Sequence, residues 1–406
     1  MNQPIELSQK AARRLALEAQ GLARGESFGR GKKAVASAIQ QLGYVQIDTI
    51  SVVQRAHHHV LNTRIPNYQE TMLNKLQAID GKVFEYWSHA AAYLPIGDYR
   101  FYQPIMQGFA QNRPRDKKLV KEILARVTAE GALQARDFEQ PAGKKTNGWW
   151  DWKPAKHMLE TLFLSGELMV KERQGFQKVY DLAERVLPDD IDTTLPTDSE
   201  WARQHTIMML RALGLGRCSD IAYARKIVRR LTRNSFKPDI GQAVNELCEE
   251  GIVVGCNVKG NTFFSLAESL NSIPSKISRS RARFLSPFDN LVINRSRTQS
   301  LFNFDYLIEC YVPEPKRKYG YFSLPILWGD ELIGRMDSKA DRKTHQFTVK
   351  NLHLEPGTKI SDALVNALVV GIEQFRLEQN CTGTTILATA PQPLARILRG
   401  KLQSTT

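Results

Sequence analysis

A pattern of an amphipathic helix, a glycine and two alternating strands occurs twice in this chain of 406 residues. In the first copy, apolar residues at helical spacing over 155–163 are followed by Gly166 and by strand patterns over 168–173 and 176–182. In the second copy, a helix over 240–248 stops at Gly251, and strand patterns over 252–258 and 262–266 flank a turn. The sequence therefore predicts two helix–hairpin modules.

More helix precedes each hairpin, over 117–129 in the first copy and over 199–213 and 219–231 in the second. Two or three helices followed by a two-stranded wing are the plan of a winged-helix module, in which the helix before the wing commonly enters a DNA groove. The alternative is a helix–hairpin unit that serves only packing or protein contacts. The first 112 residues are a candidate third, divergent copy, with helices over 8–20 and 34–42.

The last third of the chain has a different pattern. Residues 319–327, 331–338 and 345–354 alternate apolar and polar side chains, and a helix over 361–378 and a strand near 385–388 follow. We therefore predict an α+β chain of tandem winged-helix modules, three in number, followed by a β-rich C-terminal domain. The expected divisions are 1–112, 113–192, 193–275 and 276–406.

The net charge favours a polyanionic partner. Lys and Arg number 56 against 42 Asp and Glu, so the formal net charge is +14. The basic residues gather in three runs: Arg217, Arg225, Lys226, Arg229, Arg230, Arg233 and Lys237; Lys276, Arg279, Arg281 and Arg283; and Lys316, Arg317 and Lys318. A single run of this kind is usually a solvated helix face, whereas three runs with aromatic neighbours are typical of a phosphate-binding track.

Other features exclude several classes of protein. The N-terminus has neither the basic nor the apolar region of a signal peptide, and no window of 18 apolar residues occurs, so we expect a cytoplasmic protein that does not use a membrane. The five cysteines contain no CxxC pair, which argues against a zinc ribbon and a disulfide framework. Consecutive histidines at 57–59 point about 100° apart on a helix and cannot converge on one metal ion, so we expect them to be exposed or to face a groove.

One short segment combines an amide and a carboxylate. Gln46-Ile47-Asp48 lies in residues 44–50, which the pattern predicts to be a strand or turn entering a new helix. Side chains at i and i+2 of an extended segment share one face, so Gln46 and Asp48 would lie side by side. A carboxylate can accept a proton from water while an amide holds that water in line. The alternative is that Asp48 is a helix N-cap.

Residues 42–50 resemble the Gln-x-Gln or Gln-x-Asp segment of the winged-helix DNA glycosylases that unhook interstrand crosslinks, the AlkZ/AlkX-like family. Blocks that resemble the same family follow in order at 85–90, 148–154, 285–289, 315–322 and 334–339. With Asp at position 48, the segment resembles that of the AlkX (YcaQ) branch, whereas the AlkZ branch has Gln at that position. The resemblance therefore implies a broader tolerance for alkylated bases than that of AlkZ.

The resemblance implies a monofunctional glycosylase that hydrolyses the N-glycosidic bond of N7-alkylated guanine in double-stranded DNA, unhooks crosslinks and leaves abasic sites. Asp48 would act as base and electrostatic stabiliser, and Gln46 would position the water. No cofactor is implied, and we expect a monomer that associates with the nucleoid when bound to DNA. The alternative function is a non-catalytic winged-helix DNA-binding or regulatory protein.

Candidate DNA contacts come from these blocks and from the basic runs. Three segments are candidates for a hairpin that probes DNA: 173–176, 316–319 and 341–345. The predicted DNA-binding residues are Arg55, His57, Trp87, His89, Arg173, Lys259, Lys316, Arg317, Lys318, Arg342 and Lys343.

Overall fold

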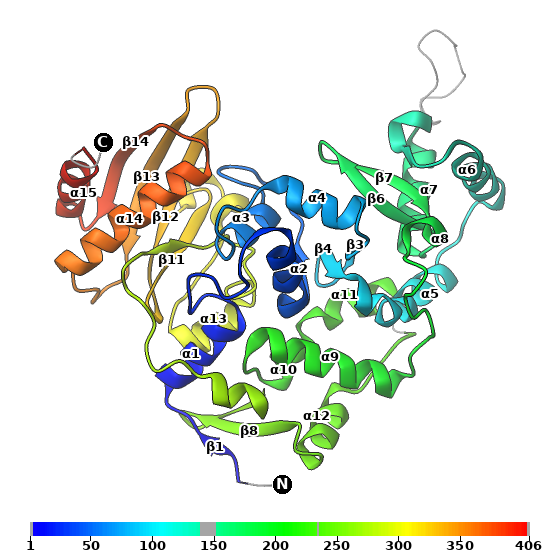
Figure 1. Cartoon of the computed structure of the whole chain (residues 1–406), viewed down its shortest axis with the longest axis horizontal. Coiled ribbons are helices and arrows are strands. Elements are labelled where there is room, and N and C mark those ends of the chain that lie inside the picture. Colours follow the sequence, from blue (N-terminus) through cyan, green and yellow to red (C-terminus); the bar gives the residue numbers. More distant parts are fainter. Residues whose placement is uncertain (1–2, 139–151, 234, 404–406) are drawn as a thin grey trace. The chain divides into compact units, whose positions relative to one another are not determined.

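The computed structural model describes residues 3–138, 152–233 and 235–403 (Figure 1). It has two compact units. Unit 1 comprises Met1–Tyr68, Ile207–Ile221 and Val244–Thr406, and unit 2 comprises Gln69–Thr206 and Ala222–Ala243. The chain is mixed α+β, as predicted. Both units are discontinuous in sequence, and the boundary after Tyr68 falls inside the expected first segment, 1–112. The division into four segments therefore stays a prediction.

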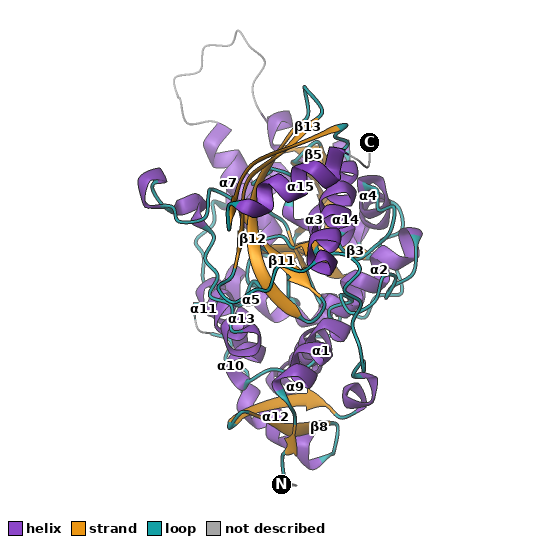
Figure 2. Cartoon of the chain, turned by 90° about the vertical axis from the view of Figure 1, so that its left-hand side faces the viewer, coloured by secondary structure: helices purple, strands orange, loops and turns teal. Residues whose placement is uncertain are grey.

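A five-stranded sheet forms the C-terminal part of unit 1, in the order β10-β11-β12-β13-β14. Neighbouring strands are antiparallel from β10 to β13, whereas β14 runs parallel to β13 and is reached through the helix α14. Helices α14 and α15 pack against this sheet (Figure 2). Their bounds are β10 (Arg283–Phe284), β11 (Ser323–Trp328), β12 (Glu331–Asp341), β13 (Gln346–Leu354), α14 (Asp362–Glu378), β14 (Gly383–Ala390) and α15 (Pro393–Gln403).

The five-stranded sheet contributes to two hydrophobic cores of unit 1. Ile326 and Ile333 belong to the core that includes α14 and α15, whereas their neighbours Leu327 and Leu332 belong to the core around the first helix of the chain. Successive strand residues point to opposite faces, so the alternation of apolar residues on β11 and β12 serves two cores. Val53 and Ala56, which follow the Gln46–Asp48 segment, pack into the first core.

The remaining elements of unit 1 include the second helix–hairpin pattern. Helix α1 begins after Ser8, whose hydroxyl accepts a hydrogen bond from the N–H of Ala11 (3.1 Å), as expected of an N-cap. An unpredicted N-terminal strand, β1, pairs parallel with β8. The elements are β1 (Ile5–Glu6), α1 (Gln9–Ala19), α2 (Gly31–Leu42), β2 (Val45–Gln46), α3 (Ala56–Asn62), α10 (Cys218–Ile221), β8 (Val253–Val258), β9 (Asn261–Leu266), α13 (Arg295–Phe302), and the 3-10 helices η4 (Glu268–Ser272), η5 (Glu309–Tyr311) and η6 (Glu314–Lys316).

Unit 2 holds the first helix–hairpin pattern and a second hairpin, β3–β4. The short strand β5 adds to the β6–β7 hairpin, which the sequence did not predict. The elements are α4 (Glu70–Ala78), β3 (Val83–Trp87), β4 (Ala91–Pro95), η1 (Ile96–Phe101), α5 (Gln103–Gln111), α6 (Lys117–Glu130), β5 (Leu133–Gln134), η2 (Ala135–Phe138), α7 (Trp152–Leu164), β6 (Leu168–Gln174), β7 (Gln177–Leu182), α8 (Ala183–Val186), η3 (Ala222–Ala224) and α11 (Arg225–Leu231). Two helices, α9 (Asp198–Leu213) and α12 (Ile240–Glu249), begin in unit 2 and end in unit 1.

Both predicted helix–glycine–hairpin patterns are confirmed. Gly166 follows α7 with a φ of +80°, and Gly251 follows α12 with a φ of +74°, a backbone region that favours glycine. Most of the block at 148–154, including Trp149 and Trp150, lies outside the described residues. Within the described part of the chain, no helix is long and apolar enough to cross a membrane.

The helix predicted over 219–231 is broken into α10, the 3-10 turn η3 and α11. The side chain of Asp220 accepts hydrogen bonds from the backbone N–H of Arg217 (2.9 Å) and from Nδ2 of Asn294 (3.0 Å). These contacts tie α10 to α13 in unit 1, and the chain enters unit 2 at Ala222. Asp220, the one acid in the basic run from Arg217 to Lys237, is therefore a buried anchor.

Candidate active site

The Gln46–Asp48 segment is held in place by a glycine turn and by one asparagine. Helix α2 ends at Gly43, which has a φ of +71°, and a Cβ there would lie 3.2 Å from Cγ of Met208. Nδ2 of Asn290 donates a hydrogen bond to the carbonyl oxygen of Tyr44 (2.9 Å). Gln46 follows as a buried residue of β2. The backbone before Asp48 is therefore fixed by contacts with distant parts of unit 1.

Asp48 is half-buried and lies in a loop, not at the start of a helix. Its Oδ1 accepts a hydrogen bond from the backbone N–H of Ile50 (2.8 Å), whereas the N-cap of α3 is Arg55. The alternative that Asp48 caps the next helix is therefore wrong. Desolvation raises the pKa of the Asp48 carboxyl, and hydrogen bonds from the backbone N–H groups of Ile50 and Thr49 act in the opposite direction.

The loop after Asp48 is fixed by the β12–β13 hairpin. Nη2 of Arg342 donates to the carbonyl oxygen of Val53 (2.8 Å) and to Oγ of Ser51 (3.4 Å), and the N–H of Ala340 donates to the carbonyl oxygen of Val52 (3.4 Å). The hairpin tip, one of the three candidate probes, thus adjoins the loop that carries Asp48. Arg342 is exposed at this position and so is its neighbour Lys343.

The backbone at the end of the basic segment 316–318 is held by one carboxylate. Glu309 accepts hydrogen bonds from the backbone N–H groups of Lys318 (2.9 Å), Tyr319 (2.7 Å) and Gly320 (3.0 Å). Lys316 and Lys318 are exposed, and Arg317 is half-buried with its guanidinium 5.0 Å from the ring centre of Tyr321. Positive side chains therefore project from a backbone that the buried Glu309 makes rigid.

Two residues that the sequence did not mark interact electrostatically with Asp48. Desolvation and then the charge of Asp48 raise the pKa of the Cys310 thiol, while the positive charge of Arg317 lowers it. Desolvation, Cys310 and Asp48 together raise the pKa of the Tyr311 hydroxyl. Tyr311 is 78% exposed, which is unusual for an aromatic side chain. The charge of Asp48 therefore acts on a thiol and on the hydroxyl of an exposed aromatic ring.

The histidine run is buried, which contradicts the expectation that it is exposed or faces a groove. His57, His58 and His59 are 2%, 5% and 1% exposed. Nδ1 of His58 lies 2.8 Å from the hydroxyl of Tyr68, and burial and then the charge of Arg55 lower the pKa of His58 to about 3. Burial lowers the pKa of His59 to about 4. These two rings are neutral core residues near neutral pH, because all residues of α3 from Ala56 to Leu61 are buried.

Arg55 is half-buried at the start of α3, and Lys259 is exposed at the β8–β9 turn of unit 1. Lys259 has a φ of +51° and precedes Gly260 in that turn. Within the residues that the structure describes, no group of three or more His, Cys, Asp or Glu side chains could hold a metal ion.

Three predicted DNA contacts lie in unit 2. Nε and Nη2 of Arg173 bind the two carboxylate oxygens of Glu85 at 2.7 Å each, and both side chains are largely buried. This ion pair gives Arg173 a structural role, whereas the sequence predicts a side chain that contacts DNA. Trp87 is half-buried at the end of β3. The ring of His89 lies 5.4 Å from that of Tyr223. Burial lowers the pKa of His89 to about 4.

Comparison with known proteins identifies one family and one similar fold. Residues 39–384 match the family described as DNA glycosylase AlkZ-like. Among solved structures, the Streptomyces sahachiroi DNA glycosylase AlkZ is similar, with a TM-score of 0.60 and 14% sequence identity over 94% of this chain and 100% of that chain. The matched range includes Gln46, Asp48, Tyr311 and the β12–β13 hairpin.

Proposed function

Because the chain belongs to the AlkZ-like DNA glycosylase family, we propose that it excises N7-alkylated guanine from double-stranded DNA and unhooks interstrand crosslinks, leaving abasic sites. The observation that carries this proposal is the half-buried carboxylate of Asp48, whose charge acts on an exposed aromatic ring and whose loop is bound by the exposed Arg342. The enzyme would act as a monomer without a cofactor, and Asp48 would place it with the AlkX branch of the family.

The chemistry requires little from the protein beyond a water molecule and negative charge. Alkylation at N7 makes guanine cationic, so the base can leave with the electron pair of the bond between C1′ and N9 without a general acid. The sugar then develops positive charge, as in other glycoside hydrolysis. Asp48 stabilises that charge and accepts the proton of the attacking water, and Gln46 orients this water. The water oxygen forms the new bond to C1′.

The exposed basic residues of unit 1 suit an open DNA-binding surface. Lys316, Lys318 and Lys343 are exposed in unit 1, and Arg342 brings a fourth positive charge next to the loop of Asp48. Such charges bind phosphates without regard to sequence. A crosslinked guanine is tethered to the opposite strand and cannot enter a tight pocket. We therefore expect the lesion to be bound at a surface and not enclosed.

The direct test measures abasic sites. Purified protein is incubated with duplex DNA that contains one N7-methylguanine, and abasic sites are then cleaved with alkali. A second duplex with an N7–N7 guanine crosslink is separated on a denaturing gel to detect unhooking. We expect strand cleavage in the first assay and single strands in the second. Absence of strand cleavage above the uncatalysed background would overturn the proposal, and cleavage without unhooking would restrict it to monoadducts.

The raised pKa of Asp48 predicts where activity is lost in acid. Asp48 acts as a base only when ionised, so the excision rate should fall as the pH drops through its pKa. Because desolvation raises that pKa, the fall should begin at a higher pH than for an ordinary aspartate, with a slope of about tenfold per pH unit. Single-turnover rates over a pH series, corrected for spontaneous depurination and with DNA binding measured in parallel, give the profile. A rate that stays constant into the usual aspartate range would remove Asp48 as the base.

Tyr311 is expected to stack on a nucleobase at the lesion. Its ring is 78% exposed, so Tyr311→Ala should leave the fold intact while it weakens binding of lesion DNA by about 5- to 100-fold, the effect of one base–aromatic stack. Tyr311→Phe keeps the ring and should bind as the wild type does. Fluorescence anisotropy with lesion DNA measures both. Equal losses in the two variants would assign the effect to the hydroxyl, and no loss in Tyr311→Ala would exclude stacking.

A further inference from the structure

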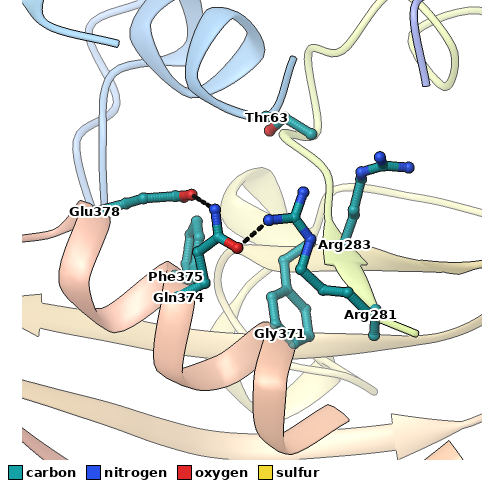
Figure 3. A pocket seen from close by; sticks show the side chains of 9 residues that line it. Thr63, Arg281, Arg283, Gly371, Gln374, Phe375 and Glu378 are labelled. Atoms are coloured by element: carbon teal, nitrogen blue, oxygen red, sulfur yellow. Dashed lines mark hydrogen bonds between the residues drawn. The ribbon is translucent and has the colours of Figure 1, made fainter. Parts of the chain in front are cut away.

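A cavity of about 470 Å³ lies in unit 1, formed by the segment after α1, the end of α3 and the segment that leads into β10. Its volume is in the range of small-molecule sites. The polar residues that line it include Arg24, Asn62, Thr63, Ser280, Arg281 and Arg283. A hollow of about 20 Å³ adjoins it, since Thr63, Arg281, Arg283 and Gln374 line both (Figure 3). Neither Asp48 nor Tyr311 contributes to its wall, so it is distinct from the candidate active site.

Arg283 brings a positive charge to this wall without a carboxylate partner among the residues that the structure describes. Its guanidinium donates hydrogen bonds to the carbonyl oxygens of Leu22 (2.5 Å) and Arg24 (3.1 Å), and its buried Nε has no hydrogen-bond partner. Burial and then the charges of Arg281 and Arg64 lower the pKa of Arg283 to about 10. An anion in the cavity would therefore stabilise this side chain.

Arg281 is also incompletely neutralised. Its Nη1 donates a hydrogen bond to Oε1 of Gln374, whose Nε2 donates to Oε1 of Glu378 at 3.0 Å (Figure 3). Burial raises the pKa of Glu378 to about 7, against the opposing effects of Gln374 and Arg281. This carboxyl is only partly ionised near neutral pH, so it offsets only part of the positive charge of the two arginines.

The other charged side chains of the cavity are already paired. The pairs are Arg64 with Asp289 (2.6 Å), Arg24 with Glu18 (3.1 Å) and Glu26 with Arg30 (2.5 Å). Arg281 and Arg283 therefore leave an excess of positive charge in a concave site that also contains the hydroxyls of Thr63 and Ser280. A guanidinium matches two oxygens of a phosphate group through parallel hydrogen bonds. We propose that this cavity binds a phosphate group, supplied by a free phosphate compound or by the DNA backbone.

The test compares two arginine variants of the full chain with a matched control. Arg281→Gln removes one positive charge, and the described hydrogen bond of Arg281 is to the side chain of Gln374. Arg283→Gln removes the second positive charge. Arg396→Gln is the control, because Arg396 is exposed on α15 away from the cavity. Titration calorimetry with inorganic phosphate and with a mononucleotide, at constant ionic strength, measures the affinity for a free phosphate compound. Fluorescence anisotropy with undamaged duplex DNA over a salt series measures the affinity for the DNA backbone.

We expect Arg281→Gln to weaken phosphate binding about tenfold relative to Arg396→Gln, the effect of losing one charge-assisted hydrogen bond. If this loss occurs with phosphate or the mononucleotide, the ligand is a free phosphate compound. If the loss of affinity occurs only with DNA, and the slope of log Kd against log salt concentration falls by about one, the phosphate belongs to the DNA backbone. Arg281→Gln and Arg283→Gln proteins that match the control in both assays would overturn the proposal. None of these measurements depends on base excision, so they test the cavity independently of the proposed activity.

Discussion

Replacing Asp48 by Asn should reduce the single-turnover excision rate by about 10²- to 10⁴-fold, the usual contribution of a positioned base. The amide can neither accept the proton of the attacking water nor offer a full negative charge to the cationic sugar. The fold should be retained, because Oδ1 of an asparagine can accept the same N–H of Ile50. Desolvation disfavours the charged form of Asp48 in the folded protein, so removal of that charge should leave the melting temperature at neutral pH unchanged or raised.

The control for this variant is Asp362→Asn, which makes the same chemical change at an exposed residue in the first turn of α14. It should excise lesions at the wild-type rate. Both variants should bind lesion DNA with wild-type affinity, since the proposed phosphate contacts are unchanged. An Asp48→Asn protein that keeps the wild-type rate would remove Asp48 from the mechanism, whereas one that loses DNA affinity instead would make Asp48 a binding residue.

The sequence predicted the local elements well because their signals are local. The helix–glycine–hairpin patterns end at Gly166 and Gly251, and each signal lies within about a dozen residues of the strand that it predicts. The broken helix after Cys218 shows the limit. Its break depends on Asp220 and on Asn294, which is 74 residues away in the sequence.

The neighbours of Asp48 could not be predicted for the same reason. Tyr311 follows Asp48 by more than 260 residues, and no periodicity connects a loop before α3 with the 3-10 helix η5. The one available signal was an aromatic residue in a Pro-containing loop just before the basic run. The hairpin turn predicts that Arg173 contacts DNA, but Glu85, 88 residues away in the sequence, binds it.

Some residues that carry the family resemblance have a structural role. Asp289, in the block at 285–289, binds Nη1 and Nη2 of Arg64 at 2.6 and 2.8 Å, and both side chains are fully buried. Arg64 also donates to the carbonyl oxygens of Gln20 (2.7 Å) and Val60 (3.0 Å). The next residue, Asn290, holds the backbone of Tyr44 before the Gln46–Asp48 segment. The ion pair thus supports both the core of unit 1 and the position of the motif.

Asp289→Ala should destabilise the protein by about 3–5 kcal/mol, because it leaves the Arg64 guanidinium buried without its counter-charge. The control is Glu331→Ala, which breaks an exposed pair with Arg279 at 2.8 Å and should cost about 1 kcal/mol or less. Urea unfolding of both variants measures the difference. A double variant, Arg64→Met with Asp289→Leu, removes both charges and should be markedly more stable than Asp289→Ala, since apolar side chains can replace a buried pair. A small loss in Asp289→Ala would mean that water or another acid reaches Arg64, and that the motif is positioned by Asn290 without help from this pair.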